Sequence, residues 1–341
     1  MRKLKIGIVG LGRVASKTHI PVLRSIENVE VVAGAEINPE RADRVKNLFG
    51  LESVYCEYSD MCSSEELDGV YVCLPNFLHR EACARALERG LHVLCEKPMG
   101  ISSEEAKELA DLARRKNLIL MPGYKKRYAR NFSRAKKLLE SGVLGKVVQV
   151  QGTFMTPGPY ISWDPKSDWY LEPKWHGVIY DSACHLVDLL LYLVPNQIKR
   201  VQTMVHNGFN GYDTPTNCSC VFQMENEVIG DLTIGWRAST DILLLSIHGT
   251  AGSLTVSRDY FSYVNPGTDP VDKLKNHLQN FMADCDSLLK KIYDKAKGKD
   301  FYAEDLAQAR AFSDAISGFQ KPPVNAEDAI RVHKFLEHLI S

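Results

Sequence analysis

The sequence predicts an α/β protein of two domains: an N-terminal domain built on a parallel sheet, and an α+β C-terminal domain built on a large, open, mostly antiparallel sheet. A chain of 341 residues is longer than one ordinary domain. Residues 1–122 alternate short apolar runs with amphipathic segments, the pattern of βαβ units. From residue 123 onward, helical patterns are mixed with segments, between Arg200 and Ser257, that alternate apolar and polar residues with the period of half-buried strands. We therefore expect domains over residues 1–122 and 123–341.

Composition and charge narrow the class of protein. Apolar residues make up 45% and charged residues 25%, as in a globular enzyme. Lys+Arg and Asp+Glu both number 42, without the basic excess that binding to nucleic acid or an anionic membrane usually requires. The nine cysteines form no Cys-x-x-Cys pair, and no segment has the pattern of a signal peptide or membrane span. We expect a cytoplasmic protein with reduced thiols, no nucleic-acid partner and no membrane partner.

Five apolar runs in the first domain are typical of buried parallel strands. These runs are Lys5–Val9, Val29–Ala33, Val70–Leu74, His92–Cys95 and Ile119–Met121. Amphipathic helices are expected over Leu78–Arg89 and Ser103–Lys116. Ser102, with Glu105 three residues later, predicts a capping box at the start of the second of these helices.

In the second domain, helical and strand-like segments are mixed. Helices are expected over Asn131–Ser141, Tyr180–Leu193, Leu274–Ala296, Ala303–Phe319 and Ala326–Ile340. Strands are expected over Val147–Phe154, Arg200–His206, Cys218–Met224, Val228–Trp236, Asp241–His248 and Ser253–Ser257. Turns at Glu225–Glu227 and Thr250–Gly252 favour hairpins between neighbouring strands.

A glycine-rich loop follows the first strand and opens a helix. Its sequence is Gly10-Leu-Gly12-Arg13-Val14-Ala15. In a dinucleotide-binding (Rossmann) domain, the first glycine makes the tight turn and the second lets the backbone approach the pyrophosphate. The helix N-terminus then faces the phosphates. A tight strand-to-helix turn without a ligand is the alternative, because one glycine triplet is weak evidence.

Glu36 stands 24 residues beyond Gly12, at the end of the second strand. A carboxylate there is suited to hold the adenosine ribose hydroxyls, and it would repel a 2′-phosphate. NAD is therefore favoured, with NADP as the alternative because Arg41 lies close in sequence. A solvated strand end is the other interpretation of Glu36.

Two further loops follow strands of the parallel sheet, at the edge where such sheets bind ligands. In Pro75-Asn76-Phe-Leu-His79, Asn76 is suited to cap a helix or bond a cofactor ribose, and His79 to pack or to contact the cofactor. In Glu96-Lys97-Pro98, two charged residues end a buried run, and Pro98 biases Lys97 to an extended backbone. Lys97 is then suited to stabilise negative charge on a reacting oxygen. A Glu96–Lys97 surface pair is the alternative.

Asp181 and His185 are four residues apart, so on an α-helix both side chains share one face, which Asp188 continues. An imidazole can accept the proton of a substrate hydroxyl while a hydride leaves the same carbon. Whether Asp181 or His185 accepts the proton stays open. The same three residues suit a divalent metal, but no second ligand cluster is apparent, and we expect no metal.

Aromatic residues gather in a segment broken by Gly and Pro, where they suit sugar rings or simply anchor a loop. They are Tyr160, Trp163, Trp169, Tyr170 and Trp175. Lys126 and Arg127 are suited to meet an anionic group of the substrate or cofactor, or to form a solvated run.

Taken together, these motifs resemble the glucose–fructose oxidoreductase/inositol dehydrogenase (Gfo/Idh/MocA) family. The similar segments are Gly-Leu-Gly-Arg-Val-Ala, Leu-Pro-Asn-x-x-His, Glu-Lys-Pro, Gly123–Tyr128, Gly142–Val147, His176–Asp188 and Lys321–Ala329. They extend over essentially the whole chain. Two departures adjoin the expected substrate pocket: Trp175-His176-Gly177 replaces a glycine run, and Ala183 stands where a glycine is common.

The resemblance implies an NAD(P)-binding Rossmann domain, followed by a domain for substrate binding and for assembly into a homodimer or homotetramer. It implies that Lys97, Asp181 and His185 line the nicotinamide. Expected cofactor contacts are Gly10, Gly12, Arg13, Val14, Glu36, Pro75, Asn76, His79, Glu96, Lys97 and Arg127. Expected substrate contacts are Lys97, Tyr124, Trp163, Trp169, His176, Asp181 and His185.

The function that we expect is hydride transfer between NAD(P) and a hydroxyl or carbonyl carbon of a sugar, polyol or sugar derivative. One alternative is an enzyme that retains its NAD and uses it twice, in a glycosidase-like elimination or an exchange between two aldoses. Another is a non-catalytic NAD(P)-sensing regulator, which would not need Lys97, Asp181 and His185 together.

Overall fold

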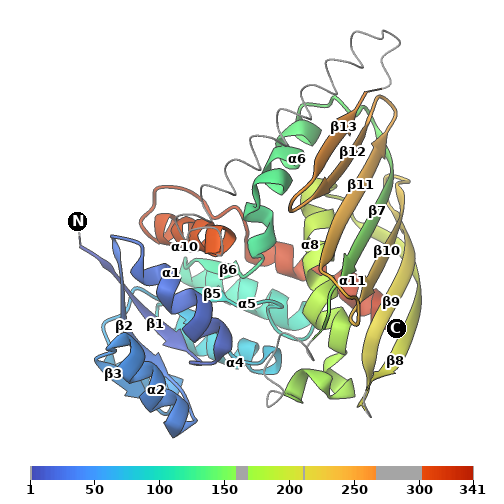
Figure 1. The fold of residues 1–341 in the computed structure, drawn as a ribbon. Coiled ribbons are helices and arrows are strands. Elements are labelled where there is room, and N and C mark those ends of the chain that lie inside the picture. Colours follow the sequence, from blue (N-terminus) through green and yellow to red (C-terminus); the bar gives the residue numbers. More distant parts are fainter. Residues whose placement is uncertain (1, 159–167, 210–211, 266–301, 341) are drawn as a thin grey trace. The chain divides into compact units, whose positions relative to one another are not determined.

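The computed structural model describes residues 2–158, 168–209, 212–265 and 302–340. It divides the chain into two compact units (Figure 1). The first unit comprises residues 1–125 and 302–333, and the second comprises residues 126–301 and 334–341. Residues 302–333 thus pack with the first unit, although they follow the expected boundary at residue 122. The expected helix over Leu274–Ala296 lies outside the described residues.

The first unit is built on a six-stranded sheet in the order β3-β2-β1-β4-β5-β6, and every pair of neighbours is parallel. The strands are β1 (Leu4–Val9), β2 (Val29–Ala35), β3 (Ser53–Tyr55), β4 (Gly69–Val72), β5 (His92–Cys95) and β6 (Leu120–Pro122). The chain runs outward from β1 in both directions. Its switch point therefore lies between β1 and β4, where open parallel sheets bind ligands at the carboxyl ends of their strands.

Helices connect these strands, and local signals fix where they begin and end. They are α1 (Ile20–Arg24), α2 (Pro39–Phe49), α3 (Tyr58–Ser64), α4 (Asn76–Glu88) and α5 (Ser103–Lys116). The Asn38 side chain caps α2, and Gly50 ends it in the left-handed conformation. Ser102 Oγ accepts a hydrogen bond from Glu105 N at 3.1 Å, as the capping box predicts.

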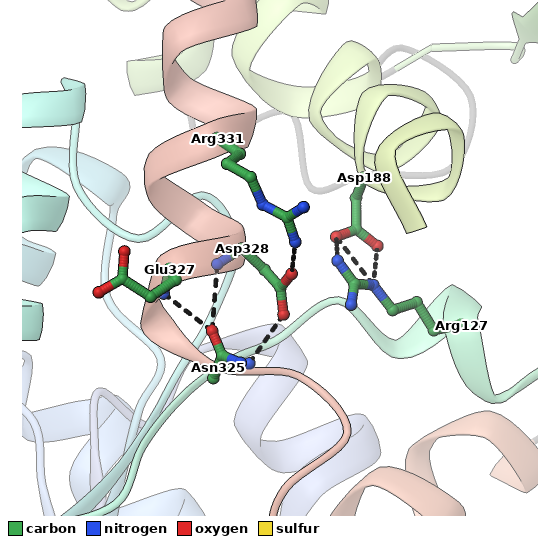
Figure 2. A network of polar contacts seen from close by, with 6 residues as sticks. All are labelled: Arg127, Asp188, Asn325, Glu327, Asp328 and Arg331. Atoms are coloured by element: carbon green, nitrogen blue, oxygen red, sulfur yellow. Dashed lines mark hydrogen bonds and ion pairs between the residues drawn. The ribbon is translucent and has the colours of Figure 1, made fainter. Parts of the chain in front are cut away.

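The C-terminal part of the first unit contains α10 (Ala303–Ile316) and the start of α11 (Ala326–Ile340). Phe312 of α10 packs edge-on against Tyr71 of β4, with ring centroids 5.5 Å apart. Asn325 and Asp328 cap α11 reciprocally: Asn325 Oδ1 accepts from Glu327 N, and Asp328 Oδ2 accepts from Asn325 N, each at 3.0 Å (Figure 2). The Phe312–Tyr71 contact, with a hydrogen bond from Asn28 Nδ2 to Ser313 Oγ at 3.2 Å, explains why a segment so late in the sequence belongs to the first unit.

The second unit is built on a seven-stranded sheet in the order β13-β12-β11-β7-β10-β9-β8. Its strands are β7 (Val147–Met155), β8 (Ile198–Phe209), β9 (Tyr212–Met224), β10 (Ile229–Gly235), β11 (Ile242–Gly249), β12 (Ser253–Ser257) and β13 (Phe261–Val264). Within this sheet, the β7–β10 pair alone is parallel among the described strands, and the other pairs are antiparallel. The predicted fold class, a parallel-sheet domain plus a mostly antiparallel one, is confirmed.

Two helices pack on one face of this sheet: α6 (Arg130–Glu140) and α8 (Cys184–Leu193). Val150, Gly152 and Phe154 of β7 are buried on that face. A Cβ on Gly152 would stand 2.6 Å from Leu232 of β10, 3.1 Å from Leu245 of β11 and 3.2 Å from Leu186 of α8, so the glycine leaves room for side chains of both neighbouring strands and of this helix. The apolar α8 is consequently buried along nearly its whole length.

Candidate active site

The glycine loop of the first unit combines a tight turn with open space. Gly10 has φ +86°, a conformation that favours glycine, and a Cβ on it would stand 2.8 Å from the Cys73 carbonyl oxygen. Gly12 differs, because no atom lies within 4 Å of the position that its Cβ would take. Helical residues begin at Arg13, so backbone N–H groups follow this open position directly.

Glu36 lies beside this loop, immediately after β2. Its Oε2 accepts a hydrogen bond from Leu11 N at 3.1 Å, and its Oε1 accepts one from Asn38 N at 2.9 Å. The side chain is buried and is not a solvated strand end. The guanidinium of Arg41 is 3.3 Å from both carboxylate oxygens and is itself partly exposed. An acidic and a basic group therefore stand together where the sequence predicts contact with the adenosine ribose.

The loop after β4 presents Pro75 and Asn76 at the start of α4. Asn76 is buried, and its Oδ1 has no hydrogen-bond partner among the described residues. The His79 ring has its Nδ1 2.7 Å from the Pro98 carbonyl oxygen and its Nε2 2.7 Å from the Leu74 carbonyl oxygen. Burial lowers the pKa of His79 against the raising effect of these contacts. His79 thus joins the loops after β4 and β5, and its contact with a cofactor stays a prediction.

Glu96 and Lys97 follow β5 at the same edge of the sheet. Glu96 Oε2 accepts a hydrogen bond from Lys97 N at 3.1 Å, and the Lys97–Pro98 peptide is cis. Glu96 Oε1 lies 2.7 Å from His19 Nε2, in a contact that the sequence analysis did not predict. Burial acts to raise the pKa of Glu96, but the hydrogen bond and charge of His19, with Lys125 and Lys97, lower it to about 2. Glu96 is therefore an ionised carboxylate fixed by hydrogen bonds, and it is not part of a surface ion pair.

In the second unit, Asp181 and His185 lie on one continuous helical stretch that is not uniformly α-helical. Asp181 belongs to a π-helical segment, Ile179–Ala183, and His185 to the first turn of α8. Because the turn between Asp181 and His185 is not regular α-helix, the four-residue spacing alone does not place the two side chains on one face, although the sequence led us to expect it. Single π-helical turns frequently occur at functional sites. His185 is buried, and its ring is 6.2 Å from that of Phe154 in an edge-on contact.

Polar contacts anchor this stretch on both sides of His185. Ser182 Oγ donates to Asp181 Oδ2 at 3.0 Å and accepts from Trp236 Nε1 at 3.1 Å. Asp188 accepts hydrogen bonds from Arg127 Nε at 2.9 and 3.0 Å and from Arg127 Nη2 at 2.6 Å (Figure 2). Arg127 is therefore buried in an ion pair and does not belong to a solvated run. Its expected contact with the cofactor stays a prediction.

The residues expected to meet the substrate are only partly described. Trp163, with Tyr160, lies outside the described residues. Trp169 packs edge-on with Tyr170 at a centroid distance of 5.6 Å, and Tyr124 of the first unit is fully buried. His176 has φ +56°, a left-handed conformation that is uncommon for a residue with a side chain, and Gly177 follows with φ +43°. The ring of His176 is 5.3 Å from that of Tyr180, and burial lowers its pKa.

Neither a metal-binding cluster nor a membrane-spanning helix is present in the described parts of the chain. There, no three His, Cys, Asp or Glu side chains are grouped so that they could hold a metal ion. Within the same residues, none of the helices has both the length and the apolar character needed to cross a bilayer.

The first unit fits a dinucleotide. The open position at Gly12, the N–H groups of the helix that follows, the Glu36 carboxylate and the buried amide oxygen of Asn76 lie at or beside the carboxyl ends of β1, β2 and β4. These groups would hold, in turn, the pyrophosphate, a ribose and a further hydroxyl or amide of NAD. Lys97 and the glycine loop share this sheet edge, whereas Asp181 and His185 belong to the second unit. That the three predicted catalytic groups converge on one carbon stays a prediction.

Similarity to known proteins agrees with this fit. The chain is 27% identical over 201 residues to the myo-inositol 2-dehydrogenase of Thermotoga maritima, covering 58% of this chain and 57% of the relative. It is 32% identical over 193 residues to the glucose-6-phosphate 3-dehydrogenase of Bacillus subtilis, covering 55% and 53%. The chain thus matches little more than half the length of these curated relatives.

Among solved structures, the WlbA dehydrogenase of Bordetella pertussis, crystallised with NADH and UDP-GlcNAcA, has a similar fold. It superposes with a TM-score of 0.85 at 19% identity, over 99% of this chain and 95% of that one. The sequence profile of an oxidoreductase family with an NAD-binding Rossmann fold matches residues 4–124. The family profile of the GFO/IDH/MocA C-terminal domain matches residues 132–255. Together these profiles match most of the sequence, and the chain belongs to the Gfo/Idh/MocA family of oxidoreductases.

Proposed function

We propose that this protein is an NAD-dependent dehydrogenase that transfers a hydride between the nicotinamide and a CH–OH carbon of a sugar, polyol or sugar derivative. One observation carries the proposal: the glycine loop and Lys97 lie at the same edge of one parallel sheet. β1 ends at the loop, β5 ends just before Glu96 and Lys97, and β4 lies between these two strands. A bound dinucleotide and a cationic side chain therefore share that edge.

In this proposal, Lys97 has one role, and either His185 or Asp181 has the other. When bound, NAD supplies the carbon that accepts or returns the hydride. The Lys97 ammonium donates a hydrogen bond to the reacting oxygen and stabilises negative charge there. His185 or Asp181 takes the proton from the hydroxyl and returns it in the reverse direction. The contacts of Ser182 and Asp188 hold the stretch that bears these two groups.

The relatives support a polyhydroxylated substrate. Their names refer to myo-inositol and glucose 6-phosphate, and the WlbA dehydrogenase was crystallised with a UDP-linked sugar. Each of these compounds carries at least two adjacent hydroxyl groups on a ring. His176 departs from the family's glycine run and stands five residues before Asp181, so we assign it to substrate contact. We assign Trp169 to the same role because it belongs to the aromatic segment just before His176.

The outer face of the second unit's sheet favours self-association. Met204 of β8 is 81% exposed, Val221 of β9 is 54% exposed and Ile229 of β10 is 51% exposed, and strand register puts all three on one face. We propose that this face pairs with a second copy, which gives a homodimer or homotetramer. Light scattering of wild-type protein and of Val221→Lys would show a loss of assembly in the variant; a monomeric wild type would refute the proposal.

The proposed function is tested by offering sugars, inositols and nucleotide sugars with NAD and with NADP, and following the absorbance of the reduced cofactor. We expect net NADH formation with at least one ring polyol. Lys97→Ala should abolish it, and the matched control Lys116→Ala, an exposed lysine of α5, should not. A cofactor that stays bound while sugar is converted without net NADH would indicate the retained-NAD enzyme. NAD binding without any turnover would indicate a regulator.

A further inference from the structure

His19 makes a contact that the proposed mechanism does not yet use. Its Nε2 is 2.7 Å from Glu96 Oε1, and the histidine is only 2% exposed. Because an ionised carboxylate can only accept hydrogen bonds, the proton of this contact lies on His19 Nε2. The ring of Tyr71 also packs against His19, with the two ring centroids 5.2 Å apart.

The backbone before His19 is shaped to make this contact. The segment Ala15–His19, which begins three residues after Gly12, is π-helical, and Ile20 N donates to the Ala15 carbonyl five residues back. Pro21 has no N–H group, so the ordinary α-helical bond from this position to Lys17 cannot form. A wide turn of this kind inside a short helix often marks a functional position. Here it directly joins the glycine loop to His19.

On the other side of the pair, Glu96 holds the backbone of the predicted catalytic lysine. Its Oε2 accepts from Lys97 N at 3.1 Å, while its own N–H donates to the Val72 carbonyl of β4 at 2.9 Å. The Glu96 carboxylate thus accepts a hydrogen bond from His19 on one oxygen and from the Lys97 backbone N–H on the other. The histidine contact therefore ties this carboxylate to the segment that follows the glycine loop.

We propose that His19 is a positioning residue: it holds the Glu96 carboxylate and, through it, the turn that carries Lys97, and so connects that turn to the glycine loop. The role given to Lys97 rests on the proposed function. The link between His19 and Glu96 does not, and the two can be tested separately.

The charges around Glu96 predict how the pair responds to pH. His19 faces it from the segment after the glycine loop, Lys97 from its own loop and Lys125 from the segment after β6. His79 of α4 and the thiols of Cys73 and Cys95 also lie within electrostatic range. Burial is the strongest influence and opposes ionisation, so removing the contact and charge of His19 raises the pKa of Glu96.

The kinetic test uses His19→Leu, which removes the donor, and His19→Gln, which keeps an N–H at a similar reach without a charge. In His19→Leu we expect kcat to fall about 10- to 100-fold, because a misplaced catalytic group costs this much, while KM for NAD changes less. His19→Gln should retain most of kcat at neutral pH but gain an acid limb in its pH profile. His92→Leu is the matched control, because it removes a half-buried histidine of the same unit that bonds Ile119 N instead.

A double-mutant cycle decides whether the two residues act as one unit. If they act as one unit, the kcat of the double variant His19→Leu/Glu96→Gln is no lower than that of the slower single variant. If the two losses multiply, or if His19→Leu keeps kcat within about twofold of the wild type, the positioning role is wrong.

A measurement without substrate separates this inference from the proposed function. In protein labelled with ¹³C at the glutamate carboxyl carbon, the Glu96 resonance is assigned by its absence in Glu96→Gln. It should not titrate between about pH 4 and 8 in the wild type, and should titrate there in His19→Leu, which removes the hydrogen-bond donor. An identical response in both proteins would overturn the link between His19 and Glu96. A failure to find any sugar substrate would overturn the proposed function and leave this result standing.

Discussion

Arg127 and Asp188 form a buried, two-pronged ion pair within the second unit. The guanidinium reaches both carboxylate oxygens at 2.6 to 3.0 Å, and the two side chains are only 6% and 1% exposed. Arg127 also lies over the Tyr192 ring, with its guanidinium carbon 4.9 Å from the centroid. The pair fastens α8, which carries His185, to the segment just before α6.

Removing one partner of this pair should destabilise the protein strongly, because the other charge is left buried. We expect Asp188→Leu to lower the free energy of unfolding by about 3–5 kcal/mol. The double variant Arg127→Met/Asp188→Leu should recover part of this loss, because neither charge remains. Denaturant unfolding measures both. If the single and double variants are equally unstable, the buried charge is not the cause.

The two glycines of the loop should respond differently to alanine. Gly10→Ala forces a left-handed backbone onto alanine and a Cβ to within 2.8 Å of the Cys73 carbonyl, so it should cost stability of about 1–3 kcal/mol. Gly12→Ala meets no atom within 4 Å and should leave stability unchanged, but its methyl group occupies the space proposed for the pyrophosphate. Calorimetry and NAD titration separate the two effects. Unchanged NAD affinity in Gly12→Ala would contradict the assignment of this loop.

Glu36 and Arg41 should together set the choice between NAD and NADP. In Glu36→Ala, the carboxylate that repels a 2′-phosphate is gone, and Arg41, which lies 3.3 Å from it in the wild type, is released. We expect the ratio of NAD affinity to NADP affinity to fall at least about tenfold, because the lost repulsion and the freed cation each contribute more than 1 kcal/mol. Adding Arg41→Ala should reverse the gain in NADP affinity. A ratio that does not change in Glu36→Ala would show that this carboxylate does not read the ribose.

His333 should make the first unit less stable in acid. Burial lowers its pKa from 6.5 to about 4 in the folded protein, whereas the unfolded chain has the ordinary value. As pH falls below 6.5, the unfolded state binds a proton that the folded state refuses, so stability decreases until about pH 4. Over this range the loss approaches about 3 kcal/mol. Unfolding of His333→Leu at pH 7 and pH 4.5 should show a smaller drop than wild type, and the exposed His206→Leu should match wild type.

Much of the fold could be predicted because its signals are local. The bounds of β5 and α5 coincide with the predicted ranges. β5 is a short, mostly apolar run, and α5 has a helical repeat of apolar residues and an N-terminal cap at Ser102. β3 and β13 were not predicted. Their sequences, Ser-Val-Tyr and Phe-Ser-Tyr-Val, mix polar with apolar residues, so neither forms an apolar run like the one that predicted the similarly short β6.

The site was less accessible from the sequence, because its contacts join distant residues. Nothing local connects His19 with Glu96, which follows 77 positions later, so the histidine was not predicted as a site residue. Its signal was available in part: Pro21 interrupts the helix that opens at the glycine loop. The π-helical segments at His19 and Asp181 escape any argument from α-helical spacing, because hydrogen-bond register, not residue type, defines them.

The most direct test of the account is the rate of hydride transfer in Lys97→Met at saturating NAD and substrate, measured in a single turnover beside the Kd for NAD. We expect the rate to fall by at least about 100-fold, because one charge-stabilising group is lost, with the Kd within about threefold of wild type. A variant that transfers hydride at the wild-type rate would contradict the placement of Lys97 at the reacting carbon.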